Sequence, residues 1–140
     1  MVRMGKEIEH QIRYVGEKAF PDEGCGMILG VELDRVQIVR EVIELQNSSP
    51  AHRDERFLIT AQQYRQTEIA AKGRNLEVLG FFHSHPNHRP EPSAYDLEHA
   101  LPSFVYIIVA VIGGVAGRMA AWTLSENRSR FDRTDIDIGS

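Results

Sequence analysis

The stretch from Phe104 to Leu124 limits the possible folds more than any other part of this sequence. Phe104–Ile112 is almost entirely apolar and rich in β-branched residues, Gly113-Gly114 follows it, and Val115–Leu124 is again mostly apolar. Two such runs on either side of a glycine pair are typical of buried strands joined by a tight turn. The sequence therefore predicts a sheet with a buried face.

Helical and strand patterns are mixed along the rest of the chain. Apolar residues recur at helical spacing over residues 8–19, and Pro21 should end that helix. Thr60, with Gln63 three residues later, resembles a capping box for a second helix that should stop near Gly73. A short third helix is expected over Ser93–Ala100, and further strands are expected over Cys25–Val31, Arg35–Leu45, Phe57–Ile59, Leu76–Phe82 and Arg130–Ile138.

These elements do not follow the strict alternation of a parallel α/β fold. We expect the α+β (mixed α/β) class, with a curved, mainly antiparallel β-sheet flanked by helices. The chain has 140 residues, 42% of them hydrophobic and 26% charged, which is the composition of an ordinary globular domain. A single domain over residues 1–140 is the expectation.

The charge and hydropathy patterns argue against some classes of partner. The chain carries 16 basic and 20 acidic side chains, a net charge of -4, and no basic stripe that would attract nucleic acid. No apolar run reaches the roughly 18 residues of a membrane span, and the first residues lack the apolar core of a signal peptide. Cys25 is the only cysteine, so no internal disulfide can form. These features favour a cytoplasmic protein without a nucleic-acid or membrane partner.

The segment Gly80–Asp96 (GFFHSHPNHRPEPSAYD) contains the most distinctive group of polar residues. His83 and His85 are two residues apart, so in a strand their side chains lie on the same face. Ten residues, three of them proline, separate His85 from Asp96, and such a loop can bring the next helix back over the strand end. Two imidazoles and one carboxylate leave the fourth position of a tetrahedral zinc open, as in catalytic zinc sites.

Simpler interpretations exist for the same residues. His83 and His85 could be exposed loop residues. Ser93-x-x-Asp96 has the form of a helix capping box, so spacing alone does not make Ser93 catalytic. Cys25 opens an apolar run and is expected to be buried rather than nucleophilic. The other histidines are expected on the surface: His10, His52, His88 and His99.

A hydrolase with such a site also needs a general acid–base. Two acidic residues stand in Pro21-Asp-Glu-Gly-Cys-Gly26, between a proline and two glycines at the mouth of a predicted strand. Glu23 stands out by this context, but Asp22 is an equal candidate on chemistry alone. Both could also be exposed turn residues.

Together these motifs resemble the signature of the JAMM metalloproteases, the catalytically competent members of the MPN-domain family. That signature is a glutamate far upstream, then His-[Ser/Thr]-His-Pro, then Ser-x-x-Asp. Here it reads Glu23, His83-Ser-His-Pro86 and Ser93-Ala-Tyr-Asp96. The context Pro21-x-Glu-x-Cys-Gly26 resembles that of small prokaryotic members, and the resemblance runs from the first helix to Leu124.

The resemblance implies a bent β-sheet with helices against it and a zinc ion held by His83, His85 and Asp96. It also implies that Glu23 takes a proton from the water that the zinc activates and passes it to the leaving amine. Ser93 would donate a hydrogen bond to the oxyanion.

Substrates of this family are often ubiquitin-like proteins joined through a C-terminal glycine, and small prokaryotic members process ubiquitin-like sulfur carriers. The expected function is a zinc-dependent peptidase or isopeptidase that cleaves after the C-terminal glycine of such a carrier. Two alternatives stay open at this point. One is a non-catalytic MPN-type interaction module, against which the full ligand set argues, and the other is a mononuclear non-haem iron enzyme.

Overall fold

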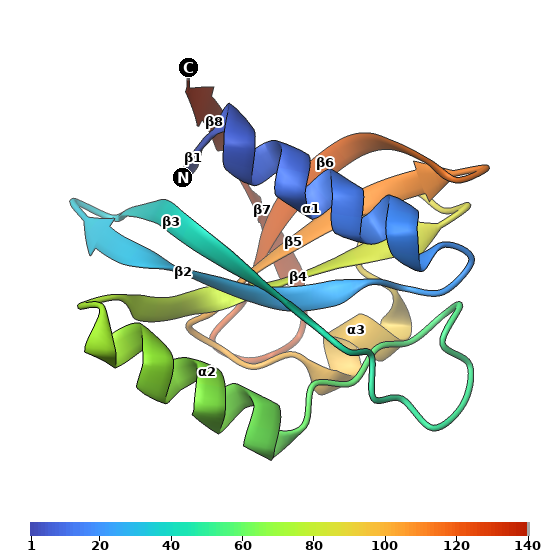
Figure 1. Ribbon diagram of the computed structural model, residues 1–140, viewed down its shortest axis with the longest axis horizontal. Coiled ribbons are helices and arrows are strands. Elements are labelled where there is room, and N and C mark those ends of the chain that lie inside the picture. The colour runs from blue at the N-terminus through green and yellow to red at the C-terminus, as the bar shows by residue number, and fades with distance from the viewer. Residues whose placement is uncertain (140) are drawn as a thin grey trace.

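Strands and helices follow one another in a mixed order along the chain (Figure 1). The structure is a computed structural model and describes residues 1–139. Its strands are β1 Val2–Gly5, β2 Cys25–Leu33, β3 Val36–Leu45, β4 Glu77–Pro86, β5 Val105–Ile112, β6 Val115–Leu124, β7 Phe131–Thr134 and β8 Ile136–Gly139, and its helices are α1 Lys6–Ala19, α2 Ala61–Gly73 and α3 Ala94–His99. Within these residues, no helix has the length and apolar character needed to cross a membrane.

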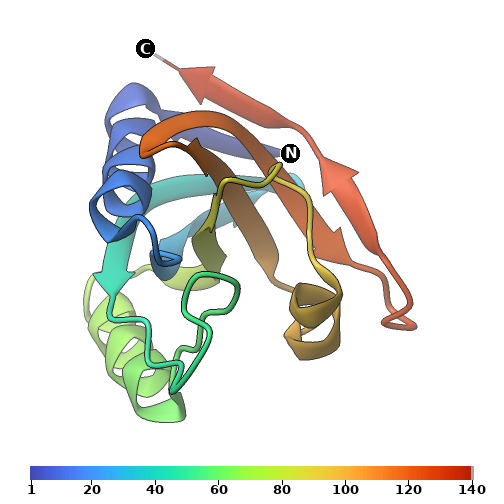
Figure 2. The same cartoon turned by 90° about the vertical axis from the view of Figure 1, so that its right-hand side faces the viewer.

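The strands form one curved sheet in the order β7-β6-β5-β4-β2-β3-β1-β8. Most neighbouring strands are antiparallel, and the pairs β4–β5, β1–β3 and β1–β8 are parallel. The edge strands β7 and β8 are consecutive in sequence with only Asp135 between them, so the chain itself links the two edges and the sheet nearly closes into a barrel (Figure 2). The predicted α+β class with a curved, mainly antiparallel sheet is confirmed.

Local sequence signals account for many of these elements. The first helix, α1, ends two residues before Pro21, as predicted. The second, α2, begins with a complete capping box: Gln63 N–H donates to Thr60 Oγ1 at 3.1 Å, and Thr60 N–H donates to Gln63 Oε1 at 2.7 Å. Strands β2 and β3, at the places of the strands predicted over Cys25–Val31 and Arg35–Leu45, form a hairpin, and its turn residues Asp34 and Arg35 have φ of 51° and 66°, as a type I′ turn requires.

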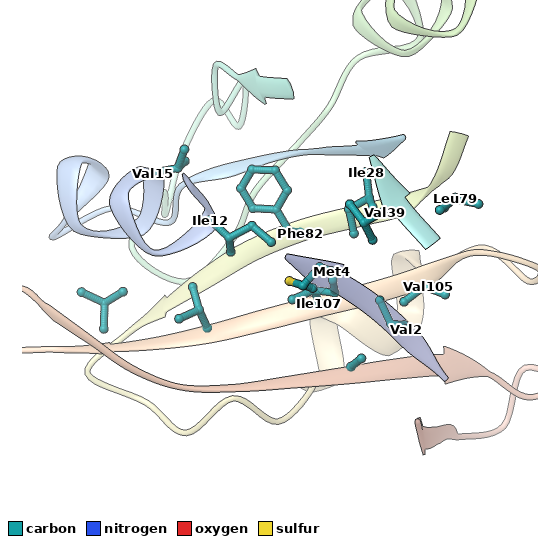
Figure 3. Close-up of a cluster of buried hydrophobic side chains, with 13 residues drawn as sticks. Val2, Met4, Ile12, Val15, Ile28, Val39, Leu79, Phe82, Val105 and Ile107 are labelled. Atoms are coloured by element: carbon teal, nitrogen blue, oxygen red, sulfur yellow. The ribbon is translucent and has the colours of Figure 1, made fainter. Parts of the chain in front are cut away.

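Helices cover both faces of the sheet, and each face has its own hydrophobic core. α1 packs on one face, where Ile12, Phe82 and Ile107 are fully buried (Figure 3). α2 and α3 contribute to the core on the other face, which includes Met27 and Phe81. Figure 1 shows α1 and α2 on opposite sides of the sheet. The neighbours Phe81 and Phe82 thus point to opposite faces, as alternation along a strand requires.

Three strand predictions differ from the structure, and one strand was not predicted. Phe57–Ile59 was expected to be a strand but lies in an irregular segment. Arg130–Ile138 forms two strands rather than one, because β7 pairs with β6 whereas β8 pairs with β1. No local pattern predicted β1, whose partners β3 and β8 are distant in sequence. The strand expected over Leu76–Phe82 continues through both histidines to Pro86.

Candidate metal centre

The two histidines of the predicted site lie at the carboxyl end of β4. His83 is central in the sheet, because it pairs with Cys25 of β2 on one side and with β5 on the other. His83 and His85 are two residues apart in this strand and therefore share a face. Ser84 points to the opposite face, where a Cβ on Gly16 of α1 would lie 3.0 Å from the Ser84 Cβ. α1 thus packs closely behind the histidines.

Asp96 reaches the histidines from α3, after the proline-rich loop that follows β4. Ser93 is the N-cap of α3: Asp96 N–H donates to Ser93 Oγ at 3.0 Å, and Ser93 N–H donates to Asp96 Oδ2 at 2.9 Å. This capping box fixes the carboxylate over the strand end. Because the Ser93 hydroxyl acts as an acceptor in the cap, its own hydrogen is available to a second partner.

The imidazoles and the carboxylate converge on one buried point. The Nε2 atoms of His83 and His85 are 3.2 Å apart, and Asp96 Oδ2 lies 3.3 and 3.1 Å from them. Three tetrahedral ligands with bonds of about 2.0 Å to a zinc ion lie about 3.3 Å from one another. The exposed fractions of His83, His85 and Asp96 are 1%, 5% and 8%. The cluster is therefore compatible with a bound metal ion in both spacing and burial.

Contacts around the cluster favour the metal-binding forms of these side chains. His85 Nδ1 donates to the backbone oxygen of Arg89 at 2.9 Å, which leaves Nε2 as the lone-pair atom. Burial lowers the pKa of His83 and so favours a neutral imidazole. Burial raises the pKa of Asp96, but the two histidines and a backbone N–H outweigh this and hold the pKa well below its usual range. A neutral imidazole and an ionised carboxylate are the forms that bind metals.

Glu23 lies beside the cluster because β2, which follows it, pairs with β4. Gly24 exchanges two hydrogen bonds with Ser84, the residue between the histidines: Gly24 N–H donates to Ser84 Oγ at 2.8 Å, and Ser84 N–H donates to Gly24 O at 3.0 Å. Glu23 is only 3% exposed, so its interpretation as an exposed turn residue is wrong. Burial, together with the charge of Asp96, raises the pKa of Glu23 to about 9.

Three buried polar atoms at the site have no hydrogen-bond partner within residues 1–139: Glu23 Oε1, His83 Nδ1 and Asp96 Oδ1. Buried polar atoms without partners are uncommon in folded proteins. The two carboxylate oxygens among them, Glu23 Oε1 and Asp96 Oδ1, indicate that the site is built to receive a further group, and the donor set of two imidazoles and a carboxylate suits a metal ion.

Two hollows border the cluster and meet at Tyr95. The polar cleft has a volume of about 460 Å³ and contains Glu23, His85 and Ser93. The apolar pocket has a volume of about 150 Å³, and its mostly aromatic and aliphatic lining includes Phe57. Phe57 also stacks on His83, with 4.4 Å between ring centroids. The cluster therefore faces a polar space on one side and an apolar space on the other.

The structure separates the two acidic candidates. Glu23 is buried and lines the polar cleft together with His85 and Ser93, whereas Asp22 is half-buried and does not line that cleft. This difference is one of burial and of position in the fold, so composition alone could not reveal it.

The remaining sequence candidates lie outside the cluster. Cys25 is buried, its thiol faces the Leu45 backbone oxygen at 3.6 Å, and burial raises the pKa of that thiol to about 12, as suits a core residue. The other four histidines, His10, His52, His88 and His99, are exposed, as predicted. Sequence reasoning gave no role at the metal centre to Ser84 and Tyr95, which stand inside the two motifs, or to Asn47 and Phe57, which belong to neither motif.

Known proteins resemble this chain over most of its length. The family described as prokaryotic homologs of the JAB domain matches residues 5–125. A desampylase from Pyrococcus furiosus is 35% identical over 104 residues, which cover 74% of this chain and 68% of the relative. A protein from Salinibacter ruber with a solution structure is 38% identical, with a TM-score of 0.77 over 99% of this chain and 92% of that one.

Two further solved structures share the fold. A protein from Desulfitobacterium hafniense has a TM-score of 0.88 at 22% identity, over 100% of this chain and 94% of that one. A JAB1/MPN domain protein from Archaeoglobus fulgidus has a TM-score of 0.60 at 19% identity, over 99% of each chain. The fold is thus that of the JAB1/MPN class. This chain belongs to the prokaryotic JAB-domain family, the small prokaryotic branch of the JAMM/MPN proteins.

Proposed function

We propose that this protein is a zinc-dependent isopeptidase that cleaves after the C-terminal glycine of a ubiquitin-like carrier protein. The buried cluster of His83, His85 and Asp96, with Glu23 in the adjoining cleft, carries the proposal because it combines the ligands of an open zinc site with a candidate base. Membership in the prokaryotic JAB family and similarity to a desampylase support a ubiquitin-like substrate. Because the sequence favours a cytoplasmic protein, we propose a carrier from the same compartment as its partner.

Each residue of the site has a separate task in this proposal. His83, His85 and Asp96 hold the zinc. When bound, zinc lowers the pKa of a coordinated water to about 7 and polarises a carbonyl oxygen. Glu23 accepts a proton from the water and gives it to the leaving amine, and its place in the polar cleft beside His85 and Ser93 suits this role.

Ser93 has a second task besides capping α3. Its hydroxyl hydrogen, free in the capping box, can donate to the carbonyl oxygen that becomes negative during attack. Ser93 and Glu23 line the same polar cleft, so a substrate carbonyl placed there would lie between the donor and the base.

In this proposal the tail of the carrier binds along residues 57–59. Leu58 N–H donates to Asn47 Oδ1 at 3.2 Å, and Leu58 O accepts from Ser48 N–H at 2.9 Å, so Leu58 is tied to the loop behind it. In this proposal an extended tail pairs with the backbone groups of Phe57 and Ile59, on the side away from that loop. Both residues also line the apolar pocket, which has room for one apolar side chain of the tail.

The direct test uses the zinc-loaded protein and a ubiquitin-like carrier from the same genome, joined through its C-terminal glycine to a lysine peptide. Mass spectrometry should find cleavage after that glycine, and replacing the glycine by a bulky residue should abolish turnover. Equal rates on the carrier and on unfolded casein would contradict carrier specificity. Metal analysis of protein purified without added metal should find zinc, and stoichiometric iron would favour the oxygenase alternative.

A further inference from the structure

Asn47, two residues beyond the end of β3, makes four hydrogen bonds to the backbone around the site. Its Nδ2 donates to the backbone oxygens of Glu23 at 3.0 Å and Arg56 at 2.9 Å. Its Oδ1 accepts from the backbone N–H groups of Ser49 at 3.1 Å and Leu58 at 3.2 Å. A side-chain amide has two N–H donors and room for two acceptor contacts, so Asn47 uses its full capacity.

The backbone of Glu23 is held by this loop through both of its polar groups. Glu23 O accepts from Asn47, and Glu23 N–H donates to Arg53 O at 2.7 Å. On the other side, the next residue, Gly24, is bonded to Ser84 between the two histidines. The Glu23 backbone is therefore fixed between the loop and the histidine strand β4. Among these contacts, the side chain of Asn47 is the only one that the loop contributes.

The same side chain reaches the segment beside the apolar pocket. Arg56 and Leu58, both bonded to Asn47, flank Phe57, which stacks on His83. Arg56 also lies over the ring of Tyr95 in α3, 4.8 Å from its centroid. One amide thus connects the candidate base to the wall along which the substrate tail is expected to lie.

We propose that Asn47 is a positioning residue that holds the Glu23 backbone and the segment 56–58 at a fixed separation. The inference rests on the proposed function, in which Glu23 moves the proton and segment 56–58 borders the substrate. Asn47 acts through these groups and does not touch the reacting atoms. Displacing a catalytic group by about 1 Å can lower a rate about 10²-fold, so the placement of the base controls turnover.

Two substitutions separate the donor nitrogen of the Asn47 amide from its acceptor oxygen. Asn47→Asp keeps the shape and the acceptor oxygen but turns the donor half into a carboxylate oxygen that faces two backbone oxygens. Asn47→Ala removes both halves. The matched control is Asn127→Ala, in the loop between β6 and β7, where Asn127 Oδ1 accepts from the Oγ atoms of Ser125 and Ser129 at 2.9 and 2.6 Å. Asn127 lies outside the linings of both hollows.

The first measurement is amide hydrogen exchange by NMR, which needs no substrate. In Asn47→Asp the Glu23 carbonyl loses its partner, so the Glu23 backbone should loosen and its amide, which donates to Arg53 O, should exchange about tenfold faster or more. The Ser49 and Leu58 amides should stay protected, because the acceptor oxygen is kept. In Asn47→Ala all three amides should exchange faster, and in Asn127→Ala none of them should change. Unchanged protection of the Glu23 amide in both Asn47 variants would overturn the proposal.

The second measurement is a double-mutant cycle on kcat with zinc-loaded protein. Asn47→Asp should lower kcat by about 10²-fold at unchanged zinc content, yet should add nothing in a Glu23→Gln background, because the base it positions is already lost. An equal, additive loss in that background would overturn the positioning role. If the wild-type protein cleaves no carrier, the proposed function fails, and the exchange measurement by itself then decides for or against the Asn47 contact.

Discussion

His85 takes part in the candidate metal centre through both ring nitrogens. Nδ1 donates to the Arg89 backbone oxygen, and Nε2 faces His83 and Asp96. The outer contact fixes the tautomer and the ring orientation, as backbone carbonyls commonly do for metal-binding histidines. A substitution at His85 therefore removes a ligand atom and also releases the start of the proline-rich loop.

We expect His85→Ala to lose both metal and activity while the protein stays folded. The site lies at the end of β4, and the two cores are formed by other side chains, so the sheet should survive. Mass spectrometry measures the metal content, and far-UV circular dichroism checks that the protein stays folded. His88→Ala, which changes an exposed loop histidine, is the control and should keep its metal. Full zinc occupancy in His85→Ala would show that the ligand assignment is incorrect.

Glu23→Gln should keep its zinc but lose activity by about 10²-fold or more, the usual scale for a lost general acid–base. The amide preserves the shape of the side chain and cannot accept the proton. Zinc content and kcat on the carrier are the measurements. Zinc loss in this variant would make Glu23 a metal ligand, and normal turnover would move the role of base to another acid such as Asp22.

Glu23 should also give the metal-free protein a pH-dependent stability. Its pKa is about 9 in the folded state and ordinary in the unfolded chain, so between pH 4.5 and 9 the folded state holds a proton that the unfolded state has lost. The free energy of unfolding therefore falls as pH rises, by at most about 1.4 kcal/mol per pH unit. Relative to wild type, metal-free Glu23→Gln should gain stability from pH 5 to pH 8. Urea unfolding that gives the same difference at both pH values would contradict this.

Among single residues, the sequence predicted those whose role follows from a local sequence pattern. His83 and His85 follow from their spacing in a strand, and Asp96 from its place near a helix start. Chemistry alone could not separate Glu23 from Asp22, and only the family resemblance selected Glu23, because the two residues differ in burial and in the cleft that they line. Asn47 could not be found at all, since its four partners meet only in three dimensions.

At the scale of elements, α3 depends on Ser93, and its two tasks can be separated. Ser93→Ala should destabilise the protein by about 1 kcal/mol through the lost cap, whereas glycine is a tolerated N-cap and Ser93→Gly should lose only a few tenths. If Ser93 is also the oxyanion donor, both variants should lower kcat by a similar factor of about 10² or more. Thermal unfolding and kcat on the carrier give the two readouts. Full kcat in Ser93→Gly would leave Ser93 as a helix cap alone.

Helices were predicted well because their signals are local. The capping boxes at Thr60 and Ser93 and the proline after α1 each lie within a few residues of the helix end that they mark. Phe57–Ile59 has an apolar strand-like composition, but the loop side chain of Asn47 and the backbone of Ser48 take the hydrogen bonds of Leu58, so the segment does not join the sheet. Its apolar side chains line the pocket instead.

For the molecule as a whole, the closure of the sheet could not be predicted from local patterns. β1 and β8 pair with each other although one begins the described chain and the other ends it. The pairing of these two short segments joins residues more than a hundred positions apart in the sequence. Neither segment is next to a turn signal that would indicate a strand. The family match spans residues 5–125, so a single domain over the full chain stays a prediction.

Removing residues 136–140 should test what this closure contributes. Ile136 and Ile138 of β8 pack on the core that includes Val2 and Met4, and without β8 the backbone of β1 becomes an unpaired edge. Burial of two half-buried isoleucines suggests a loss of about 2 kcal/mol or more in the free energy of unfolding, together with concentration-dependent association. Urea unfolding and size-exclusion chromatography measure the two effects.

The matched control for this deletion is Asp137→Ala, which removes only the exposed ion pair that Asp137 forms with Arg3 at 2.9 Å. Such pairs contribute at most about 1 kcal/mol, so the control should stay close to wild type. Because β1, β3 and β2 lie between β8 and the histidine strand β4, deleted protein that remains folded should bind metal in the same ratio as wild type. A deletion that destabilises no more than Asp137→Ala would mean that the sheet does not need its closing strand.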